Sequence, residues 1–160
     1  MSDKMITLTP SVFMGGNSHG FNFSAGIVAG LYSDKLSKDI KSGNNFQGIF
    51  GLVPWAGPSY DFYDLTDGFE NKKLGGVGGV NAFYLPSGMS FGVGWSNGVS
   101  VEQNLNRNRL EVGFRSYLNV GLPFFGVGPA LAIQNFHDSG KTLFFGIQIH
   151  GNIPVYGLEL

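Results

Sequence analysis

The chain has 160 residues, and only 13% of them are charged, against about 25% in a typical soluble domain. A net charge of −1 offers no bulk attraction to nucleic acid, and the lack of cysteine excludes disulfides, thiolate catalysis and cysteine-ligated metals. No stretch is long and apolar enough for a transmembrane helix, which needs about 20 residues.

The charged residues gather in a few clusters, at 34–41, 61–73, 102–115 and 138–141, with the rest near the two ends. The spans between the clusters are rich in glycine, aromatic and β-branched residues, and they alternate between large apolar and small polar residues. This period of two indicates β-strands, not helices.

Eight strands are expected in chain order, several of them long enough for the 9–11 residues that a membrane-spanning strand needs. A short helical turn is expected at 34–41, a tight turn at 86–88, and longer polar loops at 57–73 and 97–108. The expected strands cover about 6–14, 21–31, 45–55, 74–85, 89–96, 110–120, 124–135 and 143–155.

The polar face of these strands separates a membrane barrel from a soluble sheet. A soluble sheet would carry Lys, Glu, Arg and Asp there, whereas this face carries mostly Gly, Ser, Thr, Asn and Gln. Small residues suit the narrow lumen of an eight-stranded barrel, which side chains fill, and the large apolar face then meets lipid. We therefore predict an all-β fold, a single domain over 1–160 that forms an eight-stranded antiparallel up-and-down transmembrane β-barrel. The alternative is a soluble lipocalin-like or sandwich binder. The residues expected to face the bilayer are Phe21, Phe23, Phe91, Trp95, Phe114 and Phe145.

Polar side chains on the opposite face are expected to form a network in the lumen. Glu111 and Arg115 lie on one face of one strand and are predicted to pair, with Asn119, Gln148 and His150 nearby. The alternative is a gate or a proton path. Interface girdles are expected from six aromatic residues, Trp55, Tyr60, Phe62, Tyr63, Phe69 and Trp95.

In architecture the pattern resembles the small eight-stranded outer-membrane barrels, and this resemblance implies an outer-membrane location and a lipid bilayer as partner. The chain departs from that family at both ends, because it starts without an apolar signal segment and its last residue is Leu160, not an aromatic. Glycine-rich stretches at 20–26 and 88–94 resemble the β-rich C-terminal domains of some bacterial polymorphic toxins, which are delivered by secretion systems.

These resemblances lead to a first hypothesis of a membrane-inserting barrel without enzymatic chemistry, an antibacterial effector that perturbs a target outer membrane. It would act as an oligomer or by disrupting the bilayer, with an unknown delivery or immunity partner, no nucleic acid and no cofactor.

Two other membrane functions stay open. One is a resident outer-membrane barrel with a structural or adhesive role. The other is a lipid hydrolase that uses His137 and Ser139, since some barrel enzymes that modify lipid A use these residue types at the membrane surface. A metal site formed by His19, His137 and Asp138 is conceivable, but we expect no metal.

Overall fold

A computed structural model describes residues 5–18, 20–42, 48–65, 69–87, 91–122, 125–134, 142–151 and 153–155. These residues form long strands and a single short helix. The elements are β1 (Met5–Asn17), β2 (Gly20–Tyr32), α1 (Asp34–Ser42), β3 (Ile49–Leu65), β4 (Phe69–Leu85), β5 (Gly92–Asn104), β6 (Arg109–Leu122), β7 (Phe125–Gln134), β8 (Thr142–Gly151) and β9 (Ile153–Val155).

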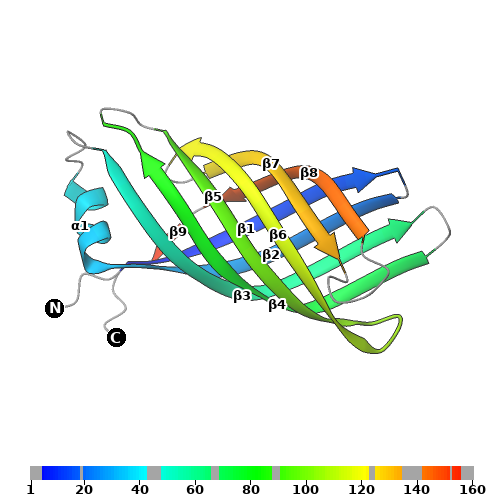
Figure 1. The fold of residues 1–160 in the computed structure, drawn as a ribbon. Coiled ribbons are helices and arrows are strands. Elements are labelled where there is room, and N and C mark those ends of the chain that lie inside the picture. Colours follow the sequence, from blue (N-terminus) through cyan, green and yellow to red (C-terminus); the bar gives the residue numbers. More distant parts are fainter. Residues whose placement is uncertain are drawn as a thin grey trace.

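Each strand from β1 to β7 pairs antiparallel with the next one along the chain, and the sheet closes because β1 pairs with both β2 and β8. The short β9 pairs with β1 beyond the end of β8, so β8 and β9 together occupy one strand position of the barrel. The predicted fold class is confirmed: the chain forms a closed, eight-stranded, up-and-down barrel with tilted strands (Figure 1). We call the end with Met5, Val155 and α1 the proximal end, and the opposite end the distal end.

The strands reach further toward the distal end than the sequence predicts. β3 and β4 are 17 residues each and are paired from Ile49↔Leu85 to Leu65↔Phe69, so the loop expected at 57–73 is wrong. β5 likewise continues to Asn104, and the loop expected at 97–108 shrinks to a turn at 105–108. The cause is the same in both places. Charged residues that suggest loops in the sequence lie on the lumenal face of continuous strands, where they are buried.

The helix α1 lies at the proximal end of the barrel (Figure 1), where the sequence predicts a short helical turn. The Ser33 hydroxyl caps it by accepting a hydrogen bond from the Leu36 backbone N–H at 3.3 Å. Leu36 packs on Ile49 and Val53. Within the described ranges, no helix combines the length and hydropathy that a membrane crossing requires.

Two Gly-Pro pairs interrupt the hydrogen-bonded ladders. Opposite Gly128-Pro129, the β6–β7 register passes from Tyr117↔Ala130 directly to Val120↔Val127. Proline has no N–H to donate to a ladder, which explains the interruption. The same gap occurs opposite Gly57-Pro58 in the β2–β3 ladder. The glycine before this proline is also required, because a Cβ atom at Gly128 would overlap the carbonyl oxygen of Leu118.

Gly128→Ala is therefore expected to destabilise the barrel by about 1–3 kcal/mol through overpacking. Gly76→Ala is the matched control, because a Cβ atom at that position would meet nothing closer than the Gly57 carbonyl oxygen at 3.7 Å. The measurement is urea-induced unfolding in phospholipid vesicles. Equal stability of the two variants would show that the close approach at Gly128 does not matter.

Candidate functional site

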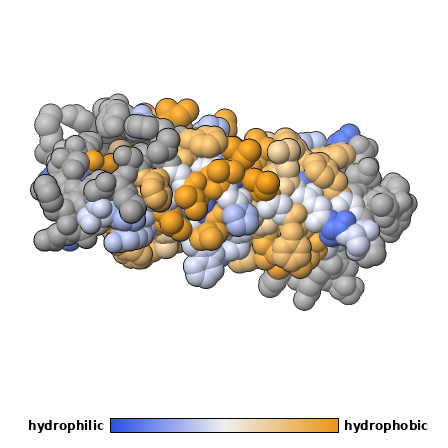
Figure 2. Space-filling model, turned by 90° about the horizontal axis from the view of Figure 1, so that it is seen from above, coloured by the Kyte–Doolittle hydropathy of each residue, from blue (hydrophilic) through white to orange (hydrophobic). Residues whose placement is uncertain are grey.

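The outer surface of the barrel is apolar. Large hydrophobic side chains stand exposed on the outward positions of the strands, and Figure 2 shows them as broad orange areas over the middle of the molecule. A closed barrel pairs its backbone groups between strands, so such a surface can lie in hydrocarbon. The chain is an eight-stranded barrel of the outer-membrane type. Such an outer surface fits a barrel that spans a lipid bilayer.

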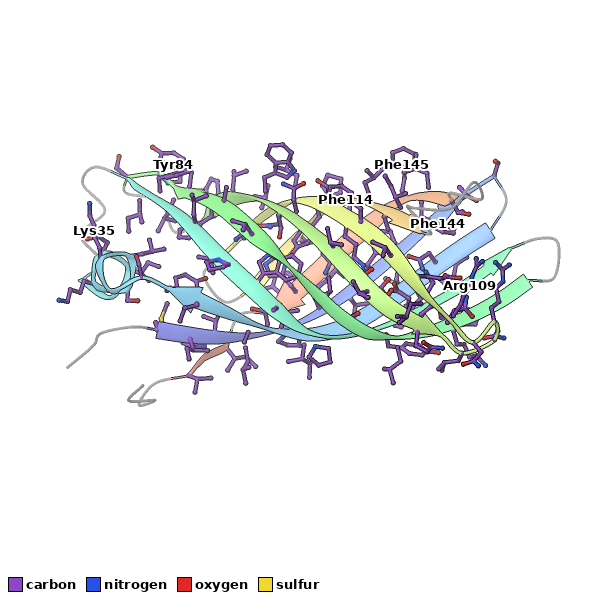
Figure 3. The ribbon with its side chains drawn as sticks, turned by 60° about the horizontal axis from the view of Figure 1, so that its bottom comes forward. Lys35, Tyr84, Arg109, Phe114, Phe144 and Phe145 are labelled. Atoms are coloured by element: carbon purple, nitrogen blue, oxygen red, sulfur yellow. The ribbon has the colours of Figure 1, made fainter. Side chains whose placement is uncertain are left out.

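Six residues are predicted from the sequence to face lipid. Phe145 is 62% exposed and points away from the barrel (Figure 3), and Trp95 is 58% exposed. Phe21 and Phe91 are also exposed, although Phe91 precedes β5 instead of lying within it. Phe23 and Phe114 occupy outward positions of β2 and β6 and are half-buried.

The predicted aromatic girdle is wrong at Trp55, which faces the lumen. Its indole N–H donates a hydrogen bond to the Ser96 hydroxyl at 3.0 Å, and Ser96 is fully buried. Trp95, by contrast, keeps its ring outside and donates to the Ser116 hydroxyl at 2.9 Å. Of the other girdle candidates, Tyr60 and Phe62 are half-buried, and the side chains of Tyr63 and Phe69 lie outside the described part.

An ionic network fills the distal half of the lumen. One Arg115 Nη atom donates to Asp61 on β3 and, at 3.3 Å, to Glu102 on β5. The side chains of both carboxylates are 0% exposed. Ser59 on β3 donates a further hydrogen bond to Glu102 at 2.6 Å. Since β4 separates β3 from β5, and β4 and β5 separate β3 from β6, these contacts join strands that are not neighbours in the sheet.

Glu111 belongs to a second part of the same network. Its carboxylate lies 3.0 Å from the Lys73 ammonium and 3.0 Å from Arg109 Nε, and Asn104 donates to it at 2.9 Å. The predicted Glu111–Arg115 pair is therefore wrong, because Glu111 binds Lys73 and Arg109 whereas Arg115 binds Asp61 and Glu102. Among the described residues, three carboxyl groups and three basic side chains take part in this network.

Asp61, Lys73 and Glu102 are members of the lumenal network that the sequence prediction missed. A signal was available, since Glu102 shares its strand face with Ser96 and Ser100, both buried. Asp61 and Lys73 are also direct cross-strand partners in the β3–β4 register. Opposite charges facing each other on the same side of a hairpin favour a lumenal pair over a loop.

The remaining predicted lumenal residues lie closer to the middle of the barrel. Asn119, Gln148 and His150 are all buried on inward positions, at 9%, 6% and 8% exposure. The Tyr117 and His150 rings approach each other, with centroids 6.1 Å apart. These residues do not belong to the ionic network, and two of them, Asn119 and His150, line a cavity in the proximal half of the lumen.

That cavity has a volume of about 350 Å³. The expectation that side chains fill the lumen is therefore correct only for its distal half. Among the residues that the structure describes, no Asp, Glu, Lys or Arg lines the cavity.

The candidate hydrolase residues His137 and Ser139, together with Asp138 and His19, lie outside the described residues. The strands that flank them are described: β7 ends at Gln134, β8 begins at Thr142, and these two residues are register partners at the distal end. Within the described ranges, no three His, Asp or Glu side chains are grouped so that they could hold a metal ion.

No protein-family profile matches the chain, and no curated protein matches it in sequence. Among solved structures, the chain is similar to an outer membrane enzyme, PagL, with 13% sequence identity and a TM-score of 0.48. The similarity covers 93% of this chain and 99% of that one.

The first hypothesis, that of a barrel without enzymatic chemistry, does not agree with this comparison, in which the similar barrel is described as an enzyme. The comparison lends no support to a toxin or effector domain.

Proposed function

We propose that the chain is an outer-membrane hydrolase that cleaves acyl esters of membrane lipid, with Ser139 as nucleophile and His137 as general base. The observation that carries the proposal is the position of the described strand ends. Because Gln134 and Thr142 are register partners, residues 135–141 connect the neighbouring strands β7 and β8 at the distal end. The candidate pair thus belongs to the end of the barrel that is opposite α1.

The surface next to this connection supports a lipid substrate. Leu143 and Phe145, the first outward residues of β8, are 39% and 62% exposed, and Phe21 on β2 is 46% exposed. The Asn17 side chain donates a hydrogen bond to the Leu143 carbonyl oxygen at 2.7 Å, which fixes the end of β1 against the start of β8. Acyl chains that lie along this apolar surface would bring their ester groups to the level of the connection.

The chemistry follows from the two residue types. His137 would take the proton of the Ser139 hydroxyl as the oxygen attacks the ester carbonyl, and would then return it to the departing alcohol. Water would hydrolyse the acyl-serine, with release of a fatty acid and the free serine. An oligomer is not needed for this function and stays a prediction.

The test is release of fatty acid by the refolded chain in vesicles of phospholipid and lipopolysaccharide, followed by mass spectrometry. Ser139→Ala and His137→Ala are each expected to lower the rate at least about a hundredfold, the low end of what a positioned base or nucleophile contributes. Ser87→Ala, an exposed hydroxyl at the proximal end, is the matched control and is expected to keep the full rate.

A fluorophosphonate provides a second readout, because it marks an activated serine covalently. Labelling of Ser139 that disappears in His137→Ala would support the proposal. Full fatty acid release by Ser139→Ala, or no release by the unmodified chain from either lipid, would overturn it.

A further inference from the structure

The proximal half of the lumen contains a cavity that the proposed hydrolase does not use. It is enclosed by inward side chains of the strands, and Ile40 of α1 contributes to its lining at the proximal end. Its volume of about 350 Å³ falls within the range of small-molecule sites, which begins near 300 Å³. The catalytic candidates belong to the other end of the barrel, so the cavity calls for a separate explanation.

The lining is divided between two kinds of side chain. Toward α1 most of the lining is apolar and includes Met5, Val28, Val53, Phe83 and Leu85, with hydroxyl groups from Thr7, Thr9 and Tyr32. Met5, Val28 and Val53 are all less than 8% exposed, and Leu36 of α1 packs against Val53 from the proximal side. The apolar share of this lining suits a hydrocarbon chain.

Toward the middle of the barrel the lining becomes polar, with Asn81, Asn119, Tyr117 and His150. Two buried atoms at this end, Asn81 Oδ1 and His150 Nδ1, have no hydrogen-bond partner within the described part of the protein. Buried polar atoms are nearly always paired, so unpaired ones that border a cavity indicate a missing partner. His150 is 92% buried, which makes this indication stronger.

Two glycines make room for these polar groups. A Cβ atom at Gly126 would come within 2.6 Å of His150 Nε2, and one at Gly94 within 2.7 Å of Asn119 Oδ1 and 3.1 Å of Asn81 Oδ1. The backbone of β5 and β7 thus leaves space that side chains would otherwise fill.

The charge of the lining limits the class of ligand. Among the described residues, the cavity wall offers neither a cation nor a carboxylate, and the charged groups of the distal network have partners there. An ion in this place would be buried without a partner, which costs far more free energy than burial of a hydroxyl that is hydrogen-bonded. The head group of the ligand should therefore be neutral.

We propose that the proximal cavity binds one neutral single-chain amphiphile. Its hydroxyl head donates to Asn81 Oδ1 and contacts His150, and its hydrocarbon chain extends toward Ile40 of α1. The proposal does not depend on the hydrolase function, because it uses none of the residues assigned to catalysis.

The two tryptophans of the chain provide the test, since Trp55 lines the cavity and Trp95 is exposed on the outside. Trp95→Phe leaves only the lumenal indole, and Trp55→Phe leaves only the outer one. The probe is 2-bromodecan-1-ol, whose bromine lies next to the hydroxyl head and quenches a neighbouring indole, added to the barrel in phosphatidylcholine vesicles. Quenching of Trp55 is expected to saturate, whereas quenching of Trp95 is expected to rise in proportion to the probe in the bilayer.

Variants and related probes locate the site. Val28→Phe fills the cavity and is expected to weaken binding at least about tenfold, and Ile27→Phe, on the outer face of the same strand, is the matched control. Asn81→Leu is expected to weaken binding about three- to tenfold through the lost hydrogen bond. Bromodecanoate and bromodecyltrimethylammonium, which carry a charge on the same chain, are expected to bind at least about tenfold more weakly.

Several results would overturn the proposal. Unsaturable quenching of Trp55 that matches that of Trp95 would mean that the cavity holds only water. Saturable binding that Val28→Phe leaves unchanged would place the site elsewhere. Equal or tighter binding of bromodecanoate would contradict the neutral head group. Each variant is first checked for the gel-mobility shift on heating that a folded barrel shows, so that misfolding is not mistaken for lost binding.

Discussion

Replacing Arg115 with methionine is expected to lower the free energy of unfolding of the barrel by about 3–5 kcal/mol, the usual range for breaking a buried ion pair. The Arg115 side chain is only 12% exposed, and both of its partners, Asp61 and Glu102, are 0% exposed. Methionine would fill much of the same volume, but it would leave two buried carboxylates without their shared cation. Urea-induced unfolding in phospholipid vesicles measures the effect.

Two comparisons separate this effect from general damage. Arg109→Met removes the ion pair with Glu111, in which the Arg109 side chain is 43% exposed. It is expected to lower the free energy of unfolding by about 1 kcal/mol or less. Adding Asp61→Asn and Glu102→Gln to Arg115→Met removes the unpaired charges and should restore much of the lost stability. A loss below about 1 kcal/mol for Arg115→Met, or no recovery in the triple variant, would contradict the network as described.

A second large effect is expected on the outer face. Val99→Arg, at the middle of β5 and 49% exposed, is expected to destabilise the barrel in a bilayer by about 2–4 kcal/mol, because an arginine there must enter the hydrocarbon core. Leu110→Arg is the matched control. It is 63% exposed on the same outer surface but lies at the distal end of β6, next to Arg109, where the expected cost is about 0–1 kcal/mol.

The contrast between these two variants depends on the membrane. On a barrel surrounded by water, an exposed arginine would cost little stability either at the middle of a strand or at its end. Equal stability of Val99→Arg and Leu110→Arg in vesicles would therefore contradict a lipid-facing outer surface. The measurement is again unfolding by urea in phospholipid vesicles, with the folded fraction read from tryptophan fluorescence.

The sequence predicts the barrel well because alternation is a local property. On β6, Leu110 and Leu118 lie outside while Glu111 and Asn119 lie inside, as period two requires. It predicts strand ends poorly where charges occur, because an Asp or Lys in a glycine-rich segment suggests a loop until its partner is known. Asp61 and Lys73 became strand residues only because the lumen supplies that partner.

Lumenal contacts are the part that the sequence could not provide. Arg115 binds residues on β3 and β5, and its partners depend on the stagger of the closed sheet, which no local pattern records. The sequence predicts the wrong face for Trp55, because the residues around it are apolar on both faces of the strand. The alternation therefore does not show which of them face the lumen. The proximal cavity could not be predicted either, since its presence depends on the sizes and positions of all the side chains that line it.

The most direct test of the membrane-spanning barrel uses the two single-tryptophan variants in vesicles of phosphatidylcholine brominated on its acyl chains. Trp95 should be strongly quenched, because it lies on the outer surface at 58% exposure, and Trp55 should be quenched little, because it faces the lumen and donates to Ser96. Strong quenching of Trp95 with weak quenching of Trp55 is the predicted result. Equal quenching of the two, or none at Trp95, would contradict a barrel whose outer face lies in lipid.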